Sequence, residues 1–166
     1  MVIDDTTEEN TMPRYLHRLT SLLAMICIAT FFLSTVLTEL FGSPAAVAQL
    51  KSWIVTPGLW ILIPAIATAG GSGMYLSRAR RGRRVDAKKK RMPLIAANGL
   101  LVLLPCAIVL ERWAGAGHFG AAFYAVQALE LVAGATNLAL MGLNVRDGLR
   151  MAGRLRPPTS AAKAVG

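Results

Sequence analysis

The chain has 166 residues, of which 54% are hydrophobic and only 16% charged, and its formal net charge is +9. The charges are clustered, so that residues 19–38, 52–77, 92–110 and 113–129 contain no charged side chain. Soluble domains contain roughly 45–50% apolar residues, and a bilayer core about 30 Å thick needs roughly 20 apolar residues per helix. These features exclude an ordinary soluble domain and predict four membrane-spanning helices.

The N-terminal half is expected to contain a tail and two of these helices. Residues 1–18 are acidic and then basic, which is typical of a disordered tail. A first transmembrane helix is predicted over 19–40, and the turn-forming residues Gly42, Ser43 and Pro44 end it. Residues 45–54 are expected to form an external connection that includes a short interfacial helix.

The second transmembrane helix is predicted over residues 55–77. Pro57 lies in its first turn, where proline is tolerated. Pro64 lies in its interior, where proline should kink the helix. Ala65, Ala69 and Gly73 recur every four residues and predict a ridge of small residues for close helix packing. A broken helix that lines a cavity is the alternative interpretation of this glycine-rich stretch.

The C-terminal half predicts a basic loop at 78–91, a third helix over 93–112 and a fourth over 121–145, followed by a tail at 146–166. Lys and Arg residues concentrate on cytoplasmic sides of membranes. Sixteen of them fall in the N-terminal tail, the basic loop and the C-terminal tail, whereas the opposite side has only Lys51 and Arg112.

This charge distribution predicts an all-α bundle of four antiparallel transmembrane helices, in up-down-up-down order, within 19–145. Both termini are expected to lie in the cytoplasm and the protein in the inner membrane. Ala46, Val47 and Ala48 resemble a signal-peptidase site. The apolar segment before them has about 22 residues, however, whereas the apolar region of a signal peptide has roughly 7–15, so we favour an uncleaved helix.

The basic loop is expected to contact anionic lipid head groups. Each Lys or Arg near the membrane surface contributes about 1 kcal/mol to this attraction. No aromatic residue is interleaved with these charges to stack on bases, so no nucleic-acid partner is expected. The residues predicted to contact head groups are Arg78, Arg80, Arg81, Arg83, Arg84, Lys88, Lys89, Lys90 and Arg91.

Polar residues of the fourth predicted helix recur at spacings of three and four, which places them on one helix face. Such a face is costly against lipid and should turn toward the other helices. Asn98 of the third helix is expected at a similar depth to Asn137, so the two could pair. The members of this predicted intramembrane polar face are Tyr124, Gln127, Glu130, Asn137, Asn144 and, across from them, Asn98.

Glu130 is the one ionisable member of this face. An ionisable group inside a membrane helix is a functional-site hypothesis by default. No Lys or Arg is expected at its depth, and burial disfavours the charged form of a carboxyl. We therefore expect Glu130 to be protonated at neutral pH and to face the bundle interior.

No residues have the spacing of a metal site or of a nucleophile and its base, so the sequence predicts neither an enzyme nor a bound metal or cofactor. His17 and His118 are expected at opposite membrane boundaries, too far apart to ligate one haem. The first functional hypothesis is an accessory or structural membrane subunit that packs on itself or in a larger complex. The alternatives are a small transporter or channel that uses Glu130, and a quinone- or haem-associated redox anchor.

Overall fold

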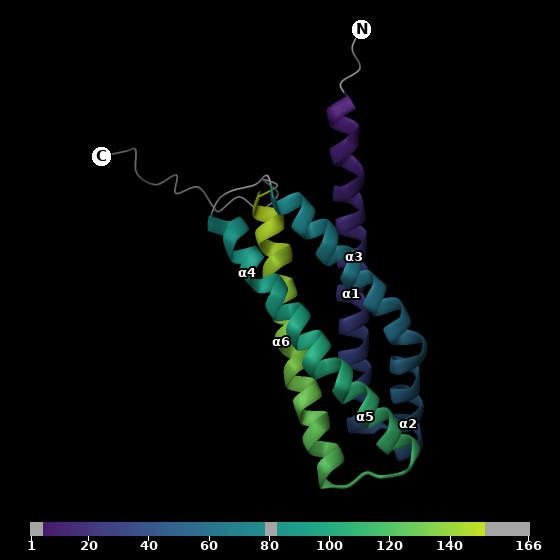
Figure 1. Cartoon of the computed structure of the whole chain (residues 1–166). Helices are drawn as coiled ribbons and strands as arrows, with labels where there is room; N and C mark the ends of the chain where they lie inside the picture. The colour runs from purple at the N-terminus through teal and green to yellow at the C-terminus, as the bar shows by residue number, and fades with distance from the viewer. Residues whose placement is uncertain (1–4, 79–82, 152–166) are drawn as a thin grey trace, which may run out of the picture.

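A computed structural model describes residues 5–78 and 83–151, and every regular element in those two ranges is a helix (Figure 1). In Figure 1 the start of α1 and the end of α6 lie at one end of the molecule, and the α5–α6 connection lies at the other. The elements are α1 (Asp5–Phe41), α2 (Pro44–Trp53), η1 (Ile54–Gly58), α3 (Leu59–Arg78), α4 (Arg83–Asn98), η2 (Gly99–Leu103), α5 (Leu104–Gly115) and α6 (Ala121–Met151).

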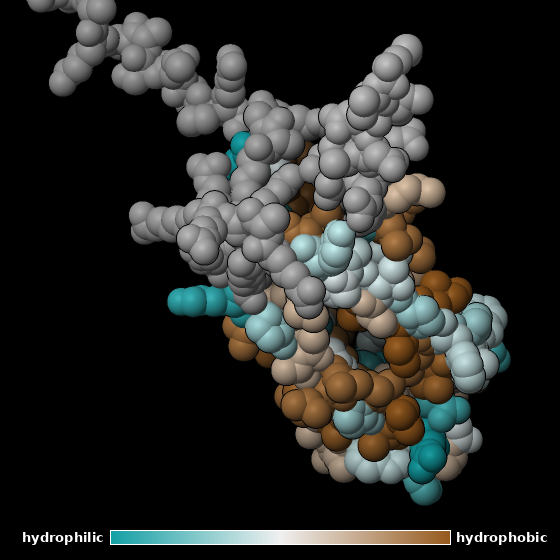
Figure 2. All heavy atoms as spheres, turned by 45° about the horizontal axis from the view of Figure 1, so that its top comes forward, coloured by the Kyte–Doolittle hydropathy of each residue, from teal (hydrophilic) through white to brown (hydrophobic). Residues whose placement is uncertain are grey.

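Four helical segments of the described chain are long and apolar enough to cross a membrane, as the sequence predicts. They are Tyr15–Phe41, Pro44–Leu76, Lys90–Gly115 and Ala121–Arg150. Large hydrophobic side chains such as Leu33, Ile63 and Val132 are exposed on them, and Figure 2 shows hydrophobic residues over much of the described surface. A lipid environment accounts for this outward-facing apolar surface.

The helices extend into regions for which the sequence suggested a tail and a loop. The expected tail at 1–18 is helical from Asp5, and the expected loop at 78–91 is helical again from Arg83. Extending an existing helix adds one hydrogen bond for each residue fixed, and the Arg, Ala and Lys residues after Arg83 are good helix formers. Residues 1–4 and 79–82 lie outside the described part.

The second span differs most from the expectation. The candidate span Pro44–Leu76 includes residues 45–54 of the expected connection. These residues form the short helix α2, and a kink within η1 separates α2 from α3. The backbone leaves helical geometry at Thr56, with φ −137° and ψ 110°, since a residue before proline is disfavoured in the α region. The break therefore precedes Pro57, and α3 runs through Pro64 as a single helix.

The third span contains a π-helical turn, η2, just before Pro105. Pro105 has no backbone N–H to donate. In the wider turn that precedes it, the Leu104 N–H donates to the Gly99 carbonyl, five residues back. Such π turns occur mostly as single insertions in α-helices, often at functional sites. Here the turn places several side chains on the wall of the cavity described below.

Packing between the spans forms two apolar clusters. In one, Ala24 and Ile28 of α1 pack against Leu62 and Ala65 of α3. In the other, Val47 of α2 packs with buried residues of α5 and α6. Ala65 and Ala69 are buried, which confirms the predicted small-residue ridge. The helix α2 packs against α5.

Candidate functional site

The central polar contact of the bundle is an ion pair between Lys51 of α2 and Glu130 of α6. Lys51 Nζ lies 2.5 Å from Glu130 Oε2, and the two side chains are 1% and 13% exposed. The N-terminus of α2 is capped by the Ser43 side chain, which accepts a hydrogen bond from the Ala46 N–H. That cap and the packing of α2 on α5 direct Lys51 into the bundle.

This ion pair corrects the prediction that no cation lies at the depth of Glu130. The sequence predicts an external position for Lys51, because the segment 45–54 is short and follows the turn-forming residues 42–44. The signal that could have identified the cation is a single lysine within the largely apolar stretch 44–54. The paired ammonium removes the reason for expecting a protonated Glu130 carboxyl.

Three further side chains surround the ion pair. Gln127 Nε2 donates a hydrogen bond of 3.0 Å to Glu130 Oε2. Glu39, near the end of α1, interacts electrostatically with both Lys51 and Glu130, as does the Cys106 thiol of α5. The Gln127 and Glu39 Oε1 atoms are buried and accept no hydrogen bond from the described residues. Among the described residues, the site therefore contains several hydrogen-bond acceptors and one cation, Lys51.

Two turns further along α6, the predicted pair of asparagines is present. Asn98 Nδ2 donates to Asn137 Oδ1 at 2.8 Å and lies 2.9 Å from the Ala133 carbonyl oxygen. Asn137 Nδ2 donates a longer bond, 3.4 Å, to the Ile95 carbonyl. This network joins α4 to α6 and uses both functional atoms of the Asn137 amide.

Two other members of the predicted polar face are placed differently. The Tyr124 side chain is 53% exposed, with its ring edge-on to Phe123, so Tyr124 does not join the interior site. Its position on the helix is rotated away from Glu130, because six residues at 100° each do not return to the same face. Asn144 is half-buried, and its Oδ1 atom has no hydrogen-bond partner in the described part of the chain.

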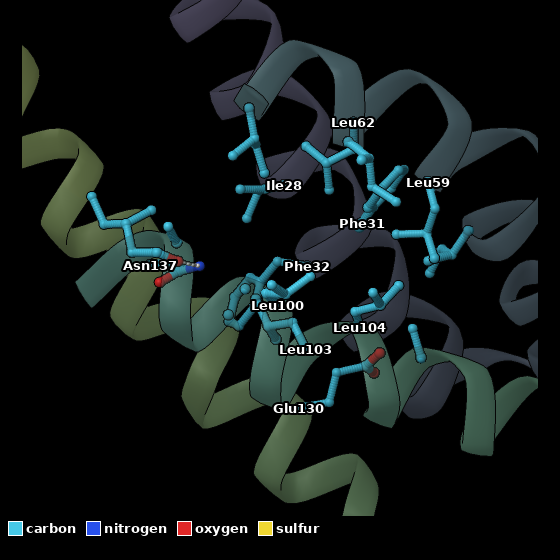
Figure 3. A pocket seen from close by; sticks show the side chains of 18 of the residues that line it. Ile28, Phe31, Phe32, Leu59, Leu62, Leu100, Leu103, Leu104, Glu130 and Asn137 are labelled. Carbon is cyan, nitrogen blue, oxygen red and sulfur yellow. Dashed lines mark hydrogen bonds between the residues drawn. The ribbon is translucent and has the colours of Figure 1, made fainter. Parts of the chain in front are cut away.

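A cavity of about 290 Å³ lies between all four spans, beside the ion pair. Its wall is almost entirely apolar and is formed by residues such as Ile28, Phe32, Leu62, Leu100 and Leu103. Glu130 and Asn137, seven residues apart on α6, also line it (Figure 3). Seven residues correspond to about 10 Å of helix, so the cavity contacts a carboxylate near one end and an amide near the other.

Most residues predicted to contact lipid head groups cannot be placed. Arg80 and Arg81 lie outside the described residues, and the side chains of Arg78, Arg83, Arg84, Lys88 and Lys89 are likewise not described. Lys90 is exposed. Arg91 instead donates a 2.6 Å hydrogen bond to the buried Asp147, so it holds α4 against α6.

Neither of the two histidines lines the cavity beside the ion pair. His17 Nδ1 is 3.0 Å from the Ala69 carbonyl oxygen and 3.3 Å from Ser72 Oγ, between α1 and α3. His118 is exposed in the α5–α6 connection. In residues 5–78 and 83–151, no three His, Cys, Asp or Glu side chains gather as a metal-binding group would require.

Comparison of the chain with models of protein families, with curated proteins and with solved structures finds no match. The site therefore has to be interpreted from its own geometry. It consists of a buried ion pair at the edge of an apolar cavity, within a bundle of membrane-length helices.

Proposed function

We propose that this chain is a multi-pass inner-membrane protein that binds a small lipophilic molecule within its helical bundle. The apolar cavity of about 290 Å³ is the observation that carries this proposal. An accessory subunit, a small transporter and a redox anchor all remain predictions. Under each of these three functions, the cavity favours a protein that binds a hydrophobic compound.

The size of the cavity supports a ligand larger than a solvent molecule. An apolar cavity of about 150 Å³ holds one benzene molecule and stays dry when empty, so this cavity has room for about twice that volume. Small-molecule sites are mostly apolar with a few placed polar groups. Glu130 and Asn137 are the polar groups here.

The walls of the cavity also support entry from the bilayer. Ile63 of α3 and Leu100 of η2 line the cavity, and both are among the exposed large hydrophobic residues. Side chains that belong to both the cavity wall and the outer surface mark the boundary between cavity and lipid. We infer that a lipophilic compound enters from the bilayer near Ile63 and Leu100.

Filling the cavity should abolish this binding. We expect Leu103→Trp to reduce photolabelling by a ten-carbon alkane that carries a diazirine at least fivefold, because the indole occupies the space of the ligand. Purified protein in nanodiscs would be irradiated and the labelled peptides quantified by mass spectrometry. Leu101→Trp is the matched control, since Leu101 lies in the same turn, is 71% exposed and does not line the cavity. Equal labelling of both variants and the unmodified protein, spread along all lipid-facing surfaces, would refute the proposal.

We also propose that the four spans are antiparallel, in up-down-up-down order, with both termini in the cytoplasm. The sixteen-to-two distribution of Lys and Arg supports this orientation. It would place the basic segment around Arg83 against the anionic lipids of the cytoplasmic leaflet.

A reporter that is active only outside the cytoplasm should give no signal when fused at Gly82 and a strong signal when fused at Gly117. The physical reason is that positively charged flanks are retained on the cytoplasmic side during insertion. A reporter active only in the cytoplasm, fused at the same two positions, provides the reciprocal control. A strong external signal at Gly82 would invert the proposed orientation.

A further inference from the structure

The two oxygens of the Glu130 carboxylate have different surroundings. Lys51 Nζ and Gln127 Nε2 both donate to Oε2, and no hydrogen bond from the described residues reaches Oε1. Glu130 and Leu104 both line the cavity (Figure 3). One carboxylate oxygen is thus held by the protein, and the other remains available to a molecule in the cavity.

The surroundings of this oxygen are short of hydrogen-bond donors. Gln127 Oε1 and Glu39 Oε1 are buried acceptors without a donor among the described residues. The Asn137 amide, the other polar group of the cavity, already donates to Ile95 and accepts from Asn98. A ligand that brings a donor would satisfy Glu130 Oε1, whereas one that brings only acceptors would leave two desolvated acceptors facing each other.

We propose that the ligand of this cavity carries a neutral hydrogen-bond donor, the hydroxyl of an alcohol or phenol, which donates to Glu130 Oε1. This inference rests on the proposed function, because it assigns the head group of the lipophilic molecule bound there. The apolar body of the ligand extends from Glu130 along α6 toward Asn137, between Phe32 and Leu103. Lys51 holds the carboxylate in place through the opposite oxygen.

The charges of the site select a neutral head over a charged one. An anionic head would be repelled by Glu130 and Glu39. The one cation that the described residues supply to the site, Lys51, already pairs with Glu130. A cationic head would approach the Lys51 ammonium closely. An ether or ketone carries no donor, so it would leave Glu130 Oε1 unsatisfied in an apolar cavity, which is costly.

A pair of probes of equal length separates these possibilities. In competition against the diazirine alkane, 1-decanol should displace the label at a concentration about tenfold lower than its isomer nonyl methyl ether. A hydrogen bond to a charged group is worth roughly that factor or more. The double variant Lys51→Met with Glu130→Leu supplies the control. It removes both charges together, keeps the volume similar and should bind the alcohol and the ether with equal affinity.

The outcomes distinguish the two proposals. If the alkane does not label the cavity at all, the proposed lipophilic site is wrong. If it labels the cavity and the alcohol and ether compete equally in the unmodified protein, the cavity binds hydrophobic compounds but the donor assignment is wrong. A preference for the alcohol that persists in the double variant would show that another group accepts the hydroxyl, and this would also overturn the inference.

Discussion

Replacement of Lys51 by methionine is expected to lower the free energy of unfolding by about 3–5 kcal/mol, the cost typical of removing one partner from a buried ion pair. Lys51 is almost fully buried and its ammonium contacts Glu130 directly. Methionine preserves most of the side-chain volume, so packing of α2 on α5 should change little. The variant retains the Glu130 carboxylate without its cation, and this carboxylate interacts with a second carboxyl, that of Glu39.

Equilibrium unfolding in mixed micelles of mild detergent and sodium dodecyl sulfate would measure this loss. The double variant Lys51→Met with Glu130→Leu tests the cause, because replacement of both partners of a buried ion pair by apolar residues is often neutral. We expect the double variant to regain stability to within about 1 kcal/mol of the unmodified protein. A double variant as unstable as Lys51→Met alone would mean that the lysine stem, and not the pairing of charges, stabilises α2.

Addition of one methyl group at Gly58 should cost about 1–3 kcal/mol, the range typical of overpacking. Gly58 is buried at the end of η1, where the second span bends. A Cβ atom there would lie 2.7 Å from Cζ of Phe31 and 2.9 Å from the Trp53 carbonyl oxygen. The ring can shift by a small amount, but the carbonyl belongs to the backbone, so Gly58→Ala should strain the packing of α1 against the bend.

Gly71→Ala provides the matched control for this methyl group. Gly71 lies in α3, the helix that follows the bend, and a Cβ at that position meets no atom within 4 Å. The same micelle titration should therefore show Gly71→Ala close to the unmodified protein and Gly58→Ala clearly below it. Similar stability of both variants would indicate that the bend at η1 accommodates a side chain.

The sequence alone determined the class of the fold. The number and approximate place of the four spans follow from hydropathy, which depends on each stretch of about 20 residues by itself, and these predictions are confirmed. The meeting of Asn98 and Asn137 also followed from the sequence, because two helices joined by a short turn bring residues of equal depth together. Burial of the small-residue ridge at Ala65 and Ala69 followed from its period of four.

Only the tertiary structure decided which residues form the site around Glu130. Lys51 is separated from Glu130 by 79 positions, and nothing in either local pattern links them. Their contact depends on the packing of the short helix α2 on α5, which brings Lys51 inside the bundle. The cavity likewise depends on how side chains of all four spans fail to fill the space between them. Hydropathy and period identify which face of a helix turns inward, whereas the partner met there depends on the packing of the other helices.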